Sequence, residues 1–92
     1  KVWPEAVESA IASLFEPDQF AVIGLPDPEW GERVVLVTTR TDVSLEQVKD
    51  LVLRTLPNYC VPKSIHIIDS IPQTAIGKIR RSEIRQYLST NE

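Results

Sequence analysis

The sequence predicts an α+β fold, in which a small three-stranded sheet is flanked by helices. Three observations predict this class. Apolar residues recur at helical spacing in three segments, and three other segments are short and either rich in β-branched residues or alternating in polarity. The connections between these segments are short, and the 92 residues suffice for one modest core. Their order along the chain, α-β-β-α-β-α, therefore favours one domain with helices packed on one sheet.

The first half of the chain predicts one helix and two strands. A helix is expected over residues 4–15, because a proline suits its first turn and apolar residues follow at helical spacing before Pro17 ends it. Residues 19–25 form a short apolar strand, and residues 33–40 form a second strand that is rich in β-branched residues. A loop of the length of residues 26–32 favours antiparallel pairing of these two strands.

The second half predicts a helix, a strand and a final helix. Ser44 and the glutamine three residues later have the spacing of a capping box, so they open a helix that stops before Pro57. Residues 63–69 alternate in polarity, as a half-buried strand does. Residues 70–77 form a loop, and residues 80–88 close the chain as a helix with one apolar face.

Composition narrows the classes of function. The net charge of −3 lacks the basic excess that is typical of nucleic-acid modules. Cys60 and His66 are the single cysteine and histidine, so neither an internal disulfide nor a zinc cluster is expected; Cys60 should pack in the core and His66 should lie half exposed in a strand. No apolar run is long enough to span a membrane, and a reduced, cytoplasmic location is expected. The chain contains no methionine, which predicts that it is a piece of a longer polypeptide.

The densest polar segment covers residues 72–81. Four cations lie in it or just beyond it: Lys78, Arg80, Arg81 and Arg85. Gly77 precedes Lys78 and allows a tight turn, and a lysine on such a loop can bring a compact charge to a phosphate or a carboxylate. The segment lacks the first glycine and the final hydroxyl of a phosphate-binding loop. From the residues alone, a solvated basic face and an anion-binding site both remain open.

Four stretches of the chain, in order, resemble motifs of the C-terminal domain of the adenylate-forming superfamily. This superfamily includes acyl- and aryl-CoA synthetases, adenylation domains of peptide synthetases, and luciferases. Residues 2–8 resemble its Pro-x-Glu-Val-Glu motif near the hinge, although Ala6 stands where the family commonly has Glu. Residues 23–32 resemble V-G-x-P-D-x-x-x-G-E, residues 56–63 resemble L-P-x-Y-x-V-P-x, and residues 71–81 resemble L-P-x-T-x-x-G-K-[IV]-x-R. Together these stretches extend the resemblance over essentially all 92 residues.

The resemblance implies the mobile C-terminal domain of an ATP-dependent acyl- or aryl-CoA ligase. Such enzymes use ATP and Mg²⁺ to convert a carboxylic acid into an acyl-adenylate, and CoA then displaces AMP to give a thioester. A large N-terminal domain binds ATP, the metal and the acid, and the small domain rotates between the two steps. The missing N-terminal domain is therefore the expected partner. No cofactor is expected on these 92 residues, which are predicted to be inactive alone, and neither nucleic acid nor a membrane is an expected partner.

The resemblance also implies roles for single residues. Lys78 matches the catalytic lysine, which would reduce the repulsion between the attacking carboxylate and the α-phosphate. Gly77 would let the loop reach in, and Thr74 is expected to shape it through a hydroxyl-to-backbone hydrogen bond. The residues implied to flank the CoA passage are Trp30, Gly31, Glu32, Tyr59 and Lys63. From the residues alone, packing of Trp30 on the sheet is an equal alternative.

Several alternatives stay open at this point. The acceptor of the acyl group is CoA, the phosphopantetheine of a carrier protein, or molecular oxygen; the adjacent Arg80 and Arg81 and the loop over residues 27–32 favour CoA. Residues 1–8 resemble 2-succinylbenzoate–CoA ligases of menaquinone synthesis. Outside this class, the basic cluster around Lys78 would suit a stand-alone module that binds an anion or RNA, which steeply salt-dependent binding would reveal.

Overall fold

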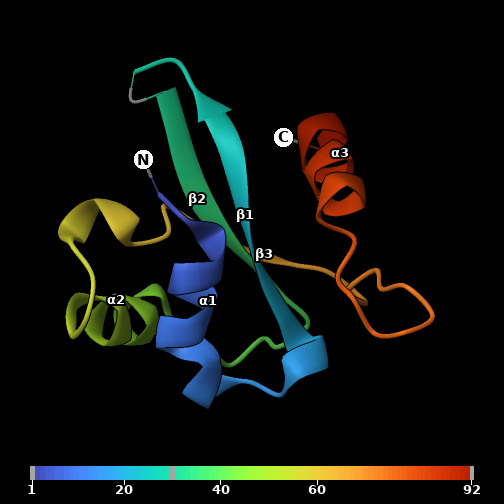
Figure 1. Ribbon diagram of the computed structural model, residues 1–92, viewed down its shortest axis with the longest axis horizontal. Coiled ribbons are helices and arrows are strands. Elements are labelled where there is room, and N and C mark those ends of the chain that lie inside the picture. The colour runs from blue at the N-terminus through green and yellow to red at the C-terminus, as the bar shows by residue number, and fades with distance from the viewer. Residues whose placement is uncertain (1, 30, 92) are drawn as a thin grey trace.

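The computed structural model describes residues 2–29 and 31–91, which form helices on both sides of one mixed sheet (Figure 1). The strand order is β1-β2-β3, with β1 (Phe20–Asp27), β2 (Gly31–Thr38) and β3 (Ile65–Ile67). β1 pairs antiparallel with β2, as predicted, and β3 pairs parallel with β2. The helices are α1 (Pro4–Ile11), α2 (Leu45–Leu53) and α3 (Arg81–Asn91). This arrangement confirms the predicted α+β class and the α-β-β-α-β-α order.

The end of the first helix was predicted wrongly. A helix was expected over residues 4–15, but α1 stops at Ile11 and a 3₁₀ turn follows over Ala12–Leu14. The backbone is then extended at Phe15, whose ring stacks on Phe20 with 4.6 Å between the ring centroids and 13° between the planes. This aromatic contact with the start of β1 draws the chain out of the helix before the proline is reached.

The connection between β1 and β2 is tighter than the predicted loop. Pairing continues until Asp27 lies opposite Gly31. The Asp27 carboxylate accepts a hydrogen bond from the Glu29 amide at 2.9 Å, and Gly31 has a φ of +83°, which glycine adopts without a steric penalty. β3, in contrast, is shorter than the predicted strand over residues 63–69, because only Ile65–Ile67 pair with β2.

Both faces of the sheet are covered, one by α1 and α2 and the other by α3 (Figure 1). The first core contains the buried residues Val7, Ile11, Val22, Leu36, Val48 and Val52. The second contains Ile23, Val35, Val37, Ile84 and Leu88. Successive strand residues point to opposite faces, so two covered faces require consecutive apolar residues in the buried parts of the strands, as in residues 20–23 of β1 and residues 34–37 of β2.

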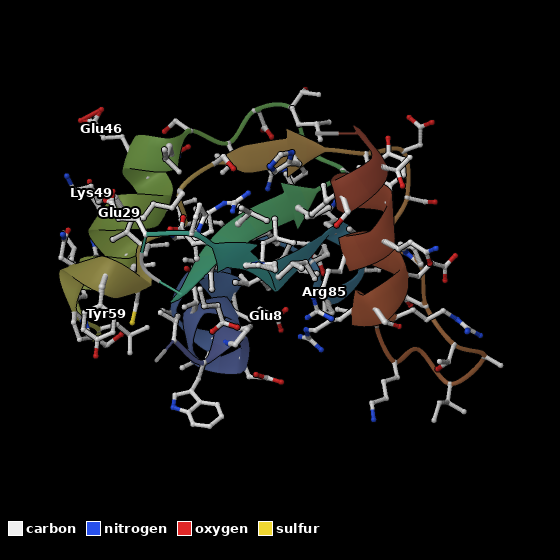
Figure 2. All side chains as sticks on the ribbon, turned by 90° about the horizontal axis from the view of Figure 1, so that it is seen from above. Glu8, Glu29, Glu46, Lys49, Tyr59 and Arg85 are labelled. Carbon is white, nitrogen blue, oxygen red and sulfur yellow. The ribbon has the colours of Figure 1, made fainter. Side chains whose placement is uncertain are left out.

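Side chains from two helices cover the free edge of β1. The Glu8 carboxylate of α1 accepts a hydrogen bond from the Val22 amide at 2.8 Å. The Arg85 side chain of α3 donates from Nε to the Gly24 carbonyl at 2.9 Å. In Figure 2, Glu8 and Arg85 both point into the space between α1 and α3. Edge groups that would otherwise be open to another strand are therefore satisfied within the chain.

Candidate functional site

Residues 72–80, between β3 and α3, form a short hairpin that we call the Lys78 hairpin. Gln73 forms an isolated antiparallel bridge with Ile79, and the Thr74 amide donates to the Lys78 carbonyl at 2.7 Å. The hairpin extends away from the sheet on the side of α3 (Figure 1). A segment that was predicted simply as a loop therefore has an ordered backbone.

The tip of the Lys78 hairpin is a β-turn. The Gly77 amide donates to the Thr74 carbonyl at 2.9 Å, and Gly77 has a φ of +86°. A glycine in this conformation after the turn is typical of hairpins with three-residue loops. The Thr74 hydroxyl accepts a hydrogen bond from the Lys78 amide at 3.1 Å, which is the hydroxyl-to-backbone bond expected from the sequence. Two local interactions therefore set the backbone from which the lysine extends.

The Lys78 side chain is exposed beside the turn. Its amine makes no hydrogen bond or ion pair with any residue in the ranges 2–29 and 31–91. Ile76, next to it at the tip, is 89% exposed. The amine is therefore accessible to a group outside the domain and is not held against the sheet.

The three neighbouring arginines bind to the domain itself. Arg81 donates from Nη2 to both carboxylate oxygens of Glu8, at 2.6 and 2.5 Å. Arg85 donates to a β1 carbonyl, and Arg80 donates from Nε to the Gln73 carbonyl at 3.3 Å. The structure therefore does not present the four cations as one free basic face, and the RNA-binding alternative gains no support from it.

The residues proposed for the CoA passage lie at another place. Gly31 and Glu32 begin β2, and the Lys63 amide donates to the Val34 carbonyl of the same strand at 2.9 Å. Tyr59 is 59% exposed in the 3₁₀ turn over Asn58–Cys60. Figure 2 shows Tyr59 and Glu29 on the same side of the molecule, opposite to the Lys78 hairpin. Trp30 lies outside the described residues. Gly31 and Glu32 thus lie at the start of β2, the Lys63 backbone lies beside the middle of β2, and Tyr59 lies on the side opposite to the Lys78 hairpin (Figure 2).

A groove with a volume of about 390 Å³ lies between α1 and the Lys78 hairpin. Its lining includes Glu8 and Ser9 of α1, Gly77 and Ile79 of the hairpin, and Arg81. The Glu8–Arg81 contact at this groove was missed from the sequence. The one signal available was an acidic residue next to the buried Val7 inside the first family-like motif, and that position on a helix does not identify a partner 73 residues away.

The described part of the chain offers few features of a metal site, a reactive cysteine or histidine site, or a membrane span. No three of its His, Cys, Asp or Glu side chains cluster as metal ligands would. Cys60 is buried in the first core, and His66 is partly buried in β3, where its ring lies 3.0 Å from the Ser64 hydroxyl. Both placements confirm the sequence prediction. None of the helices within residues 2–29 and 31–91 has the length and apolar character needed to cross a bilayer.

Curated relatives match almost the whole chain. The long-chain-fatty-acid–CoA ligase FadD13 of Mycobacterium tuberculosis is 33% identical over 90 residues, which cover 96% of this chain and 18% of that protein. A feruloyl-CoA synthase of an Amycolatopsis species is 39% identical over 88 residues, covering 92% and 18%. A 2-succinylbenzoate–CoA ligase of Listeria monocytogenes is 33% identical over 86 residues, with the same coverage. The chain therefore spans less than a fifth of the length of each of these relatives.

Solved structures show the same fold. The Mycobacterium tuberculosis fatty acyl CoA synthetase has a TM-score of 0.74 at 33% identity, over 98% of this chain and 18% of that one. The amide bond synthetase McbA from Marinactinospora thermotolerans also has a TM-score of 0.74, at 31% identity over 94% and 18%. Residues 6–78 match the family described as the AMP-binding enzyme C-terminal domain. That match spans most of the chain, and the chain belongs to this family.

Proposed function

We propose that these residues are the mobile C-terminal domain of an AMP-forming acyl- or aryl-CoA ligase, and that Lys78 supplies its catalytic amine. The observation that carries this proposal is an exposed lysine, without a partner among the described residues, on an ordered hairpin that projects from the domain. An amine with these properties suits delivery into a site that another domain completes. The resemblance of residues 71–81 to the family's final motif gives Lys78 the matching position.

The chemistry of the first step explains why an amine is needed. A carboxylate oxygen attacks the α-phosphorus of ATP, the new P–O bond forms the acyl-adenylate, and pyrophosphate leaves with the electrons of the broken bond. Both reactants are anionic, and negative charge concentrates on the phosphoryl oxygens during the transfer. The ammonium of Lys78, placed between the two groups in a site without water, would lower this repulsion in the transition state.

The second step would use the other end of the sheet. Tyr59 lies on the side of the molecule opposite to the Lys78 hairpin (Figure 2), and Glu32 and Lys63 lie at β2, so rotation of the domain would exchange one group for the other at the active site. Lys63 is exposed and can meet the phosphates of CoA, while Tyr59 offers an apolar ring with a polar end to the pantetheine or the nucleotide. Gly31, at the start of β2, would flank the passage, and Trp30 is proposed for it from the family-like motif of residues 23–32 alone.

The remaining ligands would bind mainly to the missing N-terminal domain. ATP and Mg²⁺ need several phosphate donors and oxygen ligands, whereas the described residues offer one unpaired lysine at the hairpin and no cluster of metal ligands. The residues present therefore fit a contribution to ATP chemistry but not a complete ATP site. We place the enzyme in the cytoplasm, with the N-terminal domain as its main partner.

The relatives favour CoA as the acceptor but differ in the acid. Their names specify a long-chain fatty acid, ferulate and 2-succinylbenzoate. A 2-succinylbenzoate substrate, and with it a place in menaquinone synthesis, is one candidate among these. An amine acceptor is the second candidate, because one structural relative is an amide bond synthetase. The test supplies the full-length enzyme that contains this domain with each acid and measures pyrophosphate release. CoA or an amine is then added, and AMP release is measured. AMP release on addition of CoA supports the ligase, whereas AMP release only on addition of the amine contradicts it.

A pair of glycine variants tests whether the two ends of the domain serve different steps. Gly77 and Gly31 both have positive φ, and an added Cβ would meet nothing within 4 Å at either position, so an alanine brings backbone strain without a clash. That strain is about 1–2 kcal/mol, which lowers the ratio of the native turn to its alternatives roughly 5- to 30-fold. We expect Gly77→Ala to slow adenylate formation and Gly31→Ala to slow thioester formation, each measured as a separate half-reaction. The same step slowed in both variants would contradict the proposal.

Lys63 provides a test on the CoA side. Replacing Lys63 with alanine removes an exposed cation and, if it binds a phosphate of CoA, a charged hydrogen bond worth about 1.5–3 kcal/mol. We expect the KM for CoA to rise roughly tenfold or more, with the KM for ATP unchanged. Lys49→Ala on α2 is the matched control, because Lys49 is also exposed and lies on another element. An unchanged KM for CoA would remove Lys63 from the passage.

A further inference from the structure

We infer that Glu8 is a positioning residue, which holds Arg81 and thereby fixes the base of the Lys78 hairpin. The inference rests on the proposed function, because it assigns Glu8 to the step that Lys78 would assist. Glu8 lies on α1, on one side of the sheet, and Arg81 opens α3 on the other. Arg81 also follows the last hairpin residue directly, so whatever holds Arg81 holds the end of the hairpin.

The carboxylate of Glu8 is itself held in place. Its Oε2 accepts from the Val22 amide at 2.8 Å and from Arg81 Nη2 at 2.5 Å, and its Oε1 accepts from the same nitrogen at 2.6 Å. The side chains of Glu8 and Arg81 are only 16% and 25% exposed. A backbone amide of the central sheet thus orients the carboxylate, and the carboxylate orients the guanidinium. This chain of contacts leads from β1 to the hairpin.

Helix stability alone gives no reason for an arginine at position 81. Arg81 is the first residue of α3, where the positive end of the helix dipole disfavours a cation. Its Nε is also buried without a hydrogen-bond partner among the described residues. The Glu8 carboxylate compensates the first disadvantage, because it accepts hydrogen bonds from Arg81 Nη2. A residue that breaks a local rule and is compensated by a distant one is a candidate for a role beyond folding.

The other contacts of the hairpin leave it free to tilt on the α1 side. Ile71 and Ile79 anchor its base in the second core, beneath α3. Toward α1 the hairpin faces the groove of about 390 Å³, whose lining includes both Glu8 and Arg81. The Glu8–Arg81 pair spans this groove. Without this ion pair, we expect the hairpin to move about its anchor in the second core. The Lys78 amine would then lie between the two reacting anions for a smaller fraction of the time.

Glu8→Gln in the longer enzyme tests this role, because it removes the charge and keeps an oxygen for the Val22 amide. We expect kcat for adenylate formation to fall about tenfold or more, with little change in the KM for ATP. Thioester formation from supplied adenylate should stay within twofold, which also reports that the domain is folded. Arg81→Lys keeps the positive charge and should retain more adenylation activity than Arg81→Gln.

Asp42→Asn is the matched control for loss of an ion pair. Arg40 donates two hydrogen bonds to Asp42, at 2.9 and 2.5 Å, and this bonding lowers the pKa of the Asp42 carboxyl below its ordinary value. The pair lies in the segment between β2 and α2, and its side chains are 34% and 65% exposed, more than those of Glu8 and Arg81. Asp42→Asn should leave both half-reactions unchanged.

A double variant separates the inference from the proposed function. If Glu8 acts through Lys78, adding Glu8→Gln to Lys78→Ala should not lower adenylation further. Three outcomes would overturn the inference while Lys78 keeps its role. They are a further tenfold loss of adenylation in the double variant, an equal loss of both half-reactions in Glu8→Gln, and adenylation by Glu8→Gln equal to that of Asp42→Asn. Normal adenylation by Lys78→Ala alone would overturn the proposed function, and this inference with it.

Discussion

Replacing Lys78 with alanine should slow adenylate formation by the longer enzyme roughly 10²–10³-fold. We propose that the positive charge of this amine lies between two anions. In a site without water, no solvent molecule replaces it when it is removed. Thioester formation from supplied adenylate should continue, because the other end of the sheet would then face the active site. The two half-reactions are measured separately, by pyrophosphate release and by AMP release after addition of purified adenylate.

Lys49→Ala serves again as the control for this variant. Both lysines are exposed, and both substitutions remove one positive charge, but Lys49 lies on α2, away from the hairpin (Figure 2). Adenylation by this control should be unchanged. Equal losses of the two half-reactions in Lys78→Ala would indicate damage to the domain, and would count against a role of the amine in one step.

Ile84→Ala should give the largest loss of stability among the variants considered. Ile84 is 1% exposed and packs α3 onto the sheet in the second core. Truncating it removes buried methyl groups and leaves a cavity, for which core substitutions of this size cost about 2–5 kcal/mol. For a domain of this size such a loss is a large part of the total free energy of unfolding. Urea unfolding followed by circular dichroism measures it.

The hairpin contains a matched control for Ile84. Ile76 is 89% exposed at the turn. Ile76→Ala deletes the same side-chain atoms as Ile84→Ala, but at a position already exposed to water, so it should change the free energy of unfolding by no more than about 0.5 kcal/mol. A similar loss of stability in both variants would mean that the tip of the hairpin is buried in solution. A negligible loss in Ile84→Ala would mean that α3 is not packed on the sheet as described.

The sequence predicted the elements that depend on local chemistry. Both hydrogen bonds of the Ser44–Gln47 capping box are present, and β1 and β2 follow the apolar runs. The errors lie where residues distant in the chain decide. The stacking of Phe15 on Phe20 shortens α1, and pairing with β2 sets the short length of β3. Periodicity in one segment carries no information about such partners.

The same distinction applies to the candidate site. The hydroxyl of Thr74 and the conformation of Gly77 act within five residues, so their local geometry follows from composition and spacing. The partner of Arg81 does not, because Glu8 comes near it only after the whole sheet has formed between them. The exposure of Lys78 is likewise a property of the folded domain, because it depends on the hairpin extending away from the sheet (Figure 1).

The covered edge of β1 bears on the risk of aggregation in a domain that moves away from its neighbour. A small domain that swings on a tether spends part of its cycle away from its larger neighbour, with its outer strands exposed to other proteins in a crowded solution. Glu8 and Arg85 engage the Val22 amide and the Gly24 carbonyl at the edge of β1, and β3 at the opposite edge has three residues. Neither edge therefore offers a long uninterrupted template for a foreign strand, which would limit strand-to-strand aggregation if the domain moves as proposed.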